Sequence, residues 1–543
     1  TTDWDMAQRI YDYASDLWFG FSSPILSNAG TKKGLPISCF LNYVPDSRGG
    51  LSSHYDENIW LASNGGGIGG YWGDVRSDGT STSHGSKSTG SIPFMRVVDS
   101  QMLAFNQGTT RRGSYACYMD ISHPEIEEFL FMRKSSGGDA NRKCLNLHHG
   151  INVTDEFMNA VSKNIDWKLI DPHSKKVAKS INARELWRLI LETRHETGEP
   201  YLHFVDTSNR SLPETQKKLG LSIKQSNLCS EITLPTDEDR TAVCCLSSVN
   251  LAKYDEWSTS STFIPDMVRM LDNVLEHFIQ ATYDFSYDFK GDVLDMKVKK
   301  GMEGFTKAGY SAYRERSLGL GAMGFHTYLQ KLNVPFEGPI ATGQNLKMFK
   351  QIKELANKTS MELAEERGEA PDMEGTGMRN AHLLAIAPNA TSSIICGGTS
   401  PSIEPIRANV FIHKTLNGSF QVRNRQLHNL LKQKWNNSEE LQKEYDSDYQ
   451  HFKDKIWQSI SENTGSVKHL DFLTDLGRDV FKTADEIDQN WIIEHASKRQ
   501  EFICQAQSVN LFFVAPRVQA KQEEHDNFLR YTNKVHYQAW KKG

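Results

Sequence analysis

The stretch Ser226-Asn227-Leu228-Cys229-Ser230-Glu231-Ile232 places a thiol, a carboxylate and an amide close together in the chain. Cys229 is two residues from Glu231 and two from Asn227, so the three side chains can reach a common point. A thiol beside a possible general base and a hydrogen-bonding amide is typical of an active site on a loop tip or strand end. The alternative is a buried cysteine that packs in an ordinary strand.

The other cysteines are sparse. They are Cys39, Cys117, Cys144, Cys244, Cys245, Cys396 and Cys504. They show neither the C-x-x-C spacing of metal sites nor the pattern of a disulfide scaffold. A reducing cytoplasm fits this usage, and a disulfide in that compartment is transient and catalytic rather than structural.

Length and composition indicate a large globular protein. The 543 residues exceed the usual size of one domain, so we expect several domains or one large α/β barrel with insertions. Hydrophobic residues make up 38% and charged residues 24%, and no apolar run approaches a membrane span. The first residues lack the features of a signal peptide. The net charge of −5 argues against a dedicated nucleic-acid binder.

Helical periodicity alternates with short apolar runs along the chain. Helices are predicted around Glu185–Leu191 and Met267–Phe278, and strands at His382–Ala387 and Val509–Val514. This alternation favours an α/β architecture. The polar, helix-like residues from about 416 to 490 are interpreted as a surface insertion rather than a separate domain.

The segment Ala387–Ser393 follows the predicted strand His382–Ala387. A strand that leads into a turn of small hydroxyl residues presents backbone N–H and side-chain O–H groups together, as a phosphate site requires. The alternative is a helix N-cap with additional serines.

The glycine run Gly65–Gly70 formally matches G-x-G-x-x-G, but no amphipathic helix and no P-loop Lys-Ser/Thr follow it. A Rossmann or P-loop site is therefore disfavoured. We expect close approach of the backbone to a ligand, or a mobile loop.

The polar loop Gln107–Gly113 carries paired arginines between glycines, which suits phosphate or base contacts. An exposed basic turn is the alternative.

Four motifs stand in a fixed order along the chain: Ser226–Ile232, Val243–Ser248, Pro388–Ser393 and Ser402–Pro405. In this order they resemble the large, catalytic subunit of class I ribonucleotide reductase. The sequence of Cys244–Tyr254 is most similar to the T-even phage type. With matches around Ser23 and at the C-terminal end, the resemblance covers essentially the whole chain.

The resemblance implies roles for five residues. Cys229 matches the cysteine that becomes a thiyl radical and removes the ribose 3′ hydrogen. Glu231 matches the carboxylate that takes the 3′-OH proton so that water can leave C2′, and Asn227 the amide that binds the substrate hydroxyls. Cys39 and Cys244 match the pair that supplies two electrons and ends as a disulfide.

The remaining cysteines match no catalytic position. Neighbouring strand residues face opposite sides of a sheet, so only one of Cys244 and Cys245 can point at the substrate. The family's second position is often not cysteine, and the resemblance therefore assigns Cys245 to packing. Four further cysteines are expected to be structural: Cys117, Cys144, Cys396 and Cys504.

Further positions match substrate and effector contacts. The substrate positions are Ser23, Ser38, Gly67, Pro388 and Asn389, with a diphosphate cradle at Ala390, Thr391 and Ser392. The effector positions are Asp46, Ser47, Arg76 and Arg111, where Arg111 lies in the loop that carries effector identity to the substrate site. A dNTP or ATP is the implied allosteric effector.

The two ends differ from the family pattern. Members usually carry an N-terminal ATP-cone, whereas this chain opens about one helix before the expected barrel and without an initiating Met. Tyr537–Gly543 resembles the helix end that precedes the family's strand with an adjacent tyrosine pair, and no Tyr-Tyr occurs in the sequence. We therefore expect a split or truncated large subunit that needs a second fragment to supply this strand.

The implied fold is a ten-stranded α/β barrel of two five-stranded halves, with the Cys229 finger loop inside. Residues 1–22 are expected to be the remnant of an N-terminal helical region. Residues 23–543 are expected to form the barrel, with the insertion at about 416–490 and the final strand missing. Lys521–Lys542 is predicted to be a helix capped by Gly543.

The implied activity is reduction of ribonucleoside diphosphates to deoxyribonucleoside diphosphates for DNA synthesis. The radical would come from the metal centre of a small subunit, with no covalently bound cofactor and no metal site in this chain. Thioredoxin or glutaredoxin would supply electrons to a homodimer of large subunits. The expected location is the cytoplasm, or the host cytoplasm if the protein is phage-encoded. Neither nucleic acid nor a membrane is an expected partner. Two alternatives stay open: a cobalamin-dependent class II reductase, and a non-catalytic nucleotide-binding fragment of a split large subunit.

Overall fold

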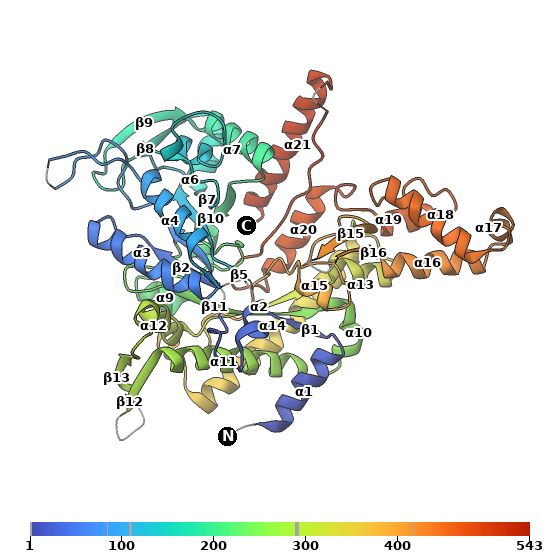
Figure 1. Ribbon diagram of the computed structural model, residues 1–543, viewed down its shortest axis with the longest axis horizontal. Helices are drawn as coiled ribbons and strands as arrows, with labels where there is room; N and C mark the ends of the chain where they lie inside the picture. Colours follow the sequence, from blue (N-terminus) through green and yellow to red (C-terminus); the bar gives the residue numbers. More distant parts are fainter. Residues whose placement is uncertain are drawn as a thin grey trace.

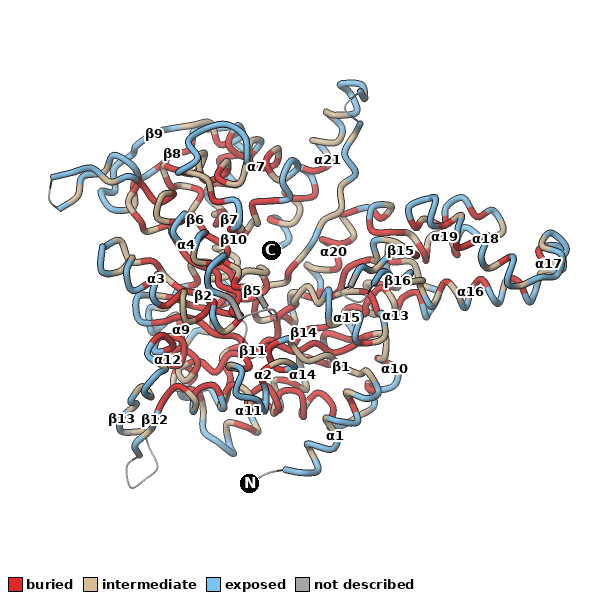
Figure 2. Tube along the Cα trace, in the orientation of Figure 1, coloured by how far each residue is buried: buried red, intermediate tan, exposed pale blue. Residues whose placement is uncertain are grey.

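The computed structural model describes residues 3–37, 39–83, 85–107, 111–287, 293–415, 418–517 and 519–543. At its centre a curved sheet of eight strands runs through the molecule, and helices surround it (Figure 1). The buried residues follow these central strands, whereas the projecting hairpins and helix ends are exposed (Figure 2). No helix among these described ranges is long and apolar enough to cross a membrane.

Five parallel strands form the first half of the sheet. Their order is β2 (Cys39–Tyr43), β3 (Gly67–Tyr71), β6 (Ser114–Asp120), β7 (His148–Val153) and β10 (Tyr201–Phe204). Parallel neighbours need crossover connections, and helices provide them. These helices are α3 (Arg48–Ser63), α4 (Ile92–Ala104), α5 (Ile126–Phe131), α6 (Asp155–Lys163) and α7 (Ala183–Thr197). The helix predicted around Glu185–Leu191 is confirmed as part of α7.

The second half of the sheet begins with β11 (Ala242–Asn250). Its first residues pair antiparallel with β2, and its later residues pair in parallel with β14 (Leu318–Met323). β1 (Phe19–Phe21) pairs antiparallel with the far end of β11, so residues 1–22 contribute a strand to this sheet. Beyond β14, single parallel bridges join Leu320 to Leu384 and Ile386 to Gln507. The predicted α/β class is therefore confirmed.

The two strands predicted in this second half are wrong in extent. His382–Ala387 makes isolated bridges, because the N–H groups of Leu383 and Leu384 donate to the sulfur of Cys504. Val509–Val514 forms no strand, because the N–H groups of Asn510 and Phe512 donate to the side chains of Glu404 and Gln489. Side-chain acceptors thus take the N–H groups that would otherwise bond to a neighbouring strand, as the apolar pattern predicts.

Long helices cover the second half. α11 (Phe263–Thr282) and α12 (Thr306–Glu315) pack on β11, and both α14 (Pro339–Arg367) and α1 (Trp4–Ser15) pack on α11. α11 confirms the helix predicted at Met267–Phe278. α20 (Gln489–Gln500) packs on α14 and α21 (Gln522–Lys541), and α21 ends before Gly543, whose φ is +71°, as the sequence predicts.

A helical arm projects from the barrel over the region predicted as a surface insertion (Figure 1). It contains β15 (Val410–Thr415), β16 (Gly418–Arg423), α16 (Arg425–Asn436), α17 (Glu439–Glu444), α18 (Tyr449–Glu462) and α19 (Asp475–Val480). Its buried apolar residues, from Val410 to Phe481, form a cluster separate from the main core. We call residues 410–481 the insertion.

The remaining elements are short. Three further hairpins are β4 (Asn106–Gln107) with β5 (Arg111–Arg112), β8 (Asp166–Ile170) with β9 (Val177–Asn182), and β12 (Tyr283–Tyr287) with β13 (Val293–Val298). The short helices are α2 (Ser23–Asn28), α8 (Val205–Ser211), α9 (Glu214–Lys218), α10 (Tyr254–Trp257), α13 (Phe325–Lys331) and α15 (Ser392–Ile395).

Candidate active site

Cys229 lies at the tip of the loop between α9 and β11, which we call the finger loop. The amide oxygen of Asn227 accepts hydrogen bonds from the backbone N–H groups of Glu231 and Ile232, both at 3.1 Å. Ser226 Oγ donates to the carbonyl of Ile232 at 2.7 Å, and Ser230 adopts a φ of +69°. These contacts join the two arms of the loop beneath Cys229, so the thiol is held on a tight turn.

The finger loop crosses directly over β3. A Cβ atom on Gly69 would lie 2.0 Å from the carbonyl oxygen of Ser226, so only glycine permits this approach. Gln225 Nε2 donates to the carbonyls of Asn42 and Gly69 at 3.0 and 3.3 Å, and Tyr118 Oη donates to the carbonyl of Asn227 at 2.8 Å. The prediction of a mobile glycine loop is therefore wrong. Gly67 to Gly70 form a buried strand, and the backbone they approach is the finger loop.

Cys39 and Cys244 face each other across the two halves of the sheet. They are register partners in the antiparallel pairing of β2 with β11. Directly opposed residues of such a pair have Cβ atoms about 4.5–5.5 Å apart, close to the separation that a disulfide needs. Burial raises the pKa of the Cys244 thiol, and the neighbouring Cys39 raises it further. Cys245 instead packs in the main core on the opposite face.

Glu231 and Asn227 are both buried beside the tip of the loop. Glu231 is held through its backbone, because its carbonyl accepts the N–H of Ala506 at 3.0 Å. Asn227 Nδ2 has no hydrogen-bond partner among the described residues. Since a buried amide donor is costly to leave unpaired, this N–H₂ group suits a hydroxyl of a bound substrate.

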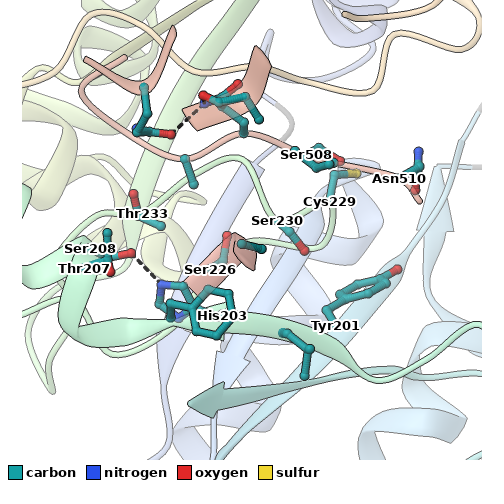
Figure 3. A pocket seen from close by; sticks show the side chains of 18 of the residues that line it. Tyr201, His203, Thr207, Ser208, Ser226, Cys229, Ser230, Thr233, Ser508 and Asn510 are labelled. Carbon is teal, nitrogen blue, oxygen red and sulfur yellow. Dashed lines mark hydrogen bonds between the residues drawn. The ribbon is translucent and has the colours of Figure 1, made fainter. Parts of the chain in front are cut away.

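A cavity of about 550 Å³ opens beside Cys229. Figure 3 shows the lining residues Cys229 and Ser230 on the finger loop, Tyr201 and His203 from β10, and Ser508 and Asn510 from the segment after α20. Cys504, expected to be structural, also lines this cavity, whereas Cys117, Cys144 and Cys396 are buried. Reasoning from sequence missed Tyr201, Asn510 and Cys504, since none of them belongs to a matched motif.

The segment predicted as a diphosphate cradle lies at the start of α15. Asn389 has a φ of +53°; its side chain accepts from Ser248 Oγ at 3.1 Å and donates to the carbonyl of Ala322 at 3.2 Å. Ala390 and Thr391 are exposed, Ser392 begins the helix, and Pro388 lines the cavity.

Two other predicted substrate positions are placed by the sheet. Ser23 begins α2 directly after β1, and β1 contacts α15, so Ser23 and the cradle lie on one side of the barrel. Gly67 is the register partner of Cys39. Ser38 falls outside the described residues.

Three of the predicted effector residues, Asp46, Ser47 and Arg76, lie together beyond the ends of β2 and β3. Arg76 Nε donates to both carboxylate oxygens of Asp46, at 3.0 and 2.9 Å, and His173 Nδ1 lies 3.2 Å from the same carboxylate. Ser47 caps α3 by accepting the N–H of Gly50. Arg111 lies in β5, and its side chain falls outside the described part of the chain.

This combination of a thiol on a finger loop, an opposed cysteine pair and a two-part barrel has a match among known families. The sequence profile of the family described as "Ribonucleotide reductase, barrel domain" matches residues 37–376 and 371–543. The chain belongs to the ribonucleotide reductase large-subunit family. Membership confirms the resemblance that the four sequence motifs carry.

Viral relatives of the ribonucleotide reductase family are similar over nearly the whole chain. A protein of Frog virus 3 (isolate Goorha), named as a ribonucleoside-diphosphate reductase large subunit, is 47% identical over 99% of this chain and 86% of its own length. The ribonucleoside-diphosphate reductase large subunit of Invertebrate iridescent virus 3 is 42% identical over 100% of this chain and 87% of its own length.

A solved structure has the same fold. The class Id ribonucleotide reductase alpha subunit of Actinobacillus ureae superimposes with a TM-score of 0.79 at 33% identity, covering 97% of this chain and 87% of that one. The barrel architecture expected from the sequence is therefore confirmed.

Proposed function

We propose that this chain is the catalytic large subunit of a class I ribonucleoside-diphosphate reductase, which converts ribonucleoside diphosphates into deoxyribonucleoside diphosphates by a thiyl-radical mechanism. The observation that carries the proposal is a thiol on a finger loop that lies against the same sheet in which two further cysteines are register partners. Cys229 stands on the finger loop between Asn227 and Glu231, and the Cys39–Cys244 pair lies on the strands beneath it.

Cys229 is the proposed hydrogen-abstracting group. Its thiol is half-buried at the edge of the cavity and is held by backbone and side-chain contacts on both arms of the loop. A weak S–H bond can be interconverted with the activated 3′ C–H bond of ribose, so the same sulfur can remove the hydrogen and later return it. A rigid loop keeps the sulfur at the distance that this exchange needs.

Glu231 and Asn227 are the proposed partners of the substrate hydroxyls. The carboxylate takes the 3′-OH proton, which allows water to leave from C2′. The unpaired N–H₂ group of Asn227 donates to a substrate hydroxyl, while its carbonyl oxygen continues to hold the loop. One side chain thus fixes both the loop and the substrate.

Cys39 and Cys244 are the proposed source of two electrons. Their register across the two sheet halves lets the two thiols close into a disulfide with little movement of the backbone. The substrate would rest with its diphosphate on Ala390, Thr391 and Ser392, and a dNTP or ATP would bind as effector at Asp46 and Arg76.

The proposed partners follow from the class of enzyme. A small subunit with a metal centre would supply the radical, and thioredoxin or glutaredoxin would restore the thiols. We further propose a homodimer of large subunits that works in the cytoplasm.

The proposal is tested by turnover of the full chain with a class I small subunit, dithiothreitol and labelled CDP. In one arm a second large-subunit fragment carrying the family's tyrosine pair is added. We expect dCDP in at least one of these arms. In that arm Cys229→Ser should lower dCDP formation by about 10⁴-fold or more, as removal of a reacting group does. Cys245→Ala, which changes a neighbouring thiol in the core, should retain activity.

Two other outcomes would contradict the proposal. Formation of dCDP with adenosylcobalamin alone would favour a class II reductase. Binding of nucleotides without dCDP in any arm would favour a non-catalytic nucleotide-binding fragment.

A further inference from the structure

Lys224 lies at the base of the finger loop, five residues before Cys229, and its ammonium group has three partners. Nζ is 3.2 Å from Asp74 Oδ2 and lies 5.0 and 5.2 Å from the ring centroids of Tyr43 and Tyr71. These two rings are stacked with their centroids 6.0 Å apart. A cation over aromatic faces and against a carboxylate is held in one place more firmly than by an ion pair alone.

The partners of Lys224 belong to the segments that carry the effector cluster. Tyr43 is three residues before Asp46, and Asp74 is two residues before Arg76. The two segments are tied twice: Tyr43 Oη donates to Asp74 at 2.9 Å, and Arg76 donates to Asp46 at 2.9 and 3.0 Å. Lys224 contacts the Tyr43–Asp74 pair, and the proposed effector would bind at the Asp46–Arg76 pair.

The neighbouring residue Gln225 anchors the loop differently. Its amide donates to backbone carbonyls of β2 and β3 in the middle of the sheet, where strands do not move independently. The carbonyl of Lys224 accepts from Asn152 Nδ2 at 2.6 Å, which fixes the backbone beside the ammonium group. The loop is therefore joined to the rigid sheet by Gln225 and to the charged turn 74–76 by Lys224.

We infer that Lys224 is a positioning residue, which transmits occupancy of the Asp46–Arg76 site to the position of Cys229. The inference rests on the proposed function, which assigns the effector to that site and the chemistry to Cys229. A nucleotide there competes for the charges of Asp46 and Arg76 and so shifts the turn that bears Asp74. Because Lys224 is paired with Asp74, it moves when this turn moves. The finger loop, whose base includes Lys224, is displaced with it.

The test measures Cys229 directly and needs no turnover. The full chain is treated with iodoacetamide with and without saturating dATP or dTTP, and alkylation of Cys229 is followed by peptide mass spectrometry. In the unaltered chain we expect a nucleotide to change the rate by about fivefold or more, the lower end of typical allosteric coupling. In Lys224→Met the change should shrink to about twofold or less, while calorimetry shows the nucleotide still bound.

Matched variants separate this role from general damage. Lys217→Met removes another paired lysine of the preceding helix, whose Nζ lies 2.7 Å from Glu214, and should respond as the unaltered chain does. Lys224→Arg keeps the charge over the rings and should restore the response. Asp74→Asn should reproduce Lys224→Met, and the double variant should lose nothing further, because both changes break one contact.

The outcomes distinguish the inference from the proposed function. If a nucleotide binds and Cys229 responds equally in Lys224→Met and the unaltered chain, the inference is overturned while the effector site stands. A nucleotide that binds without any response at Cys229 also overturns it. If neither nucleotide binds, the effector assignment fails and the inference falls with it, while activity with CDP still tests the chemistry.

Discussion

The centre of the barrel and the insertion at 410–481 are both well packed, but by different means. At the centre, buried polar side chains such as Gln225, Asn227 and Gln505 make directional hydrogen bonds to backbone groups. In the insertion, the ring of Phe452 lies 5.0 Å from Trp435 and 5.3 Å from Tyr445. Directional hydrogen bonds set the position of single atoms, whereas ring packing contributes mainly buried apolar area and therefore stability. Small changes at the centre should therefore affect chemistry, and large changes in the insertion should not.

The largest effect on turnover in this comparison is expected from Cys244→Ser. Serine keeps the shape of the side chain but cannot form the disulfide with Cys39, so the two electrons for reduction are lost. We expect no turnover above background with CDP and dithiothreitol. In a reaction without reductant, thiol titration should show two thiols consumed in the unaltered chain and none in the variant. Cys245→Ala is the control, and an equal loss in that variant would show that packing, not redox chemistry, is responsible.

Glu231→Gln should have the next largest effect. The substitution keeps size and the backbone hydrogen bond from Ala506, but removes the proton acceptor, which is worth about 10²–10⁴-fold in rate. Steady-state kinetics should show this loss in kcat with an unchanged melting temperature. Glu315→Gln is the control, because Glu315 is another fully buried carboxyl and lies far from the finger loop in the sequence. Burial raises the pKa of Glu315 to about 7. The activity of this variant should be retained, and a similar loss there would argue against a specific role of Glu231.

Gly69→Ala tests whether position alone matters at the centre. The added Cβ would lie 2.0 Å from the carbonyl of Ser226, so the finger loop has to move away from β3. Displacement of a reacting group by about 1 Å can lower the rate about 10²-fold, and overpacking costs about 1–3 kcal/mol of stability. Gly343→Ala in α14 should leave both kcat and stability intact, because among the described residues no atom beyond the helix's own backbone lies within 4 Å of the added Cβ. Normal turnover in Gly69→Ala would mean that the loop tolerates movement.

The sequence could predict those features of the centre that are local or repeated across a family. Asn227, Cys229 and Glu231 are neighbours in the chain, so their proximity needs no tertiary information. The α/β class followed from the alternation of patterns, and the barrel from the resemblance. Cys39 and Cys244 were paired by the resemblance, and the register of β2 with β11 places them opposite each other.

Other features depend on contacts between distant segments and could not be predicted. The strand expected at His382–Ala387 is interrupted because the sulfur of Cys504 takes two of its N–H groups. The glycine run predicts close approach of the backbone to a ligand or a mobile loop, whereas the segment that lies on Gly69 is the finger loop of this same chain. Tyr201 and Asn510 reach the cavity from separate elements, and no motif marks them.

The smallest effect on turnover is expected from Phe452→Ala, although it removes a large buried side chain. The ring is fully buried among the aromatic side chains of the insertion, so its loss should destabilise the insertion by about 3–5 kcal/mol. Hydrogen exchange should rise in α16 and α18, whereas kcat with CDP should stay within about twofold, because a local opening is not transmitted through a separate core. Phe129→Ala, which removes an equally buried ring from the main core, should lower both stability and turnover. If Phe452→Ala lowered turnover as strongly as Phe129→Ala, the insertion would have to be coupled to the finger loop, and the contrast between the two regions would not hold.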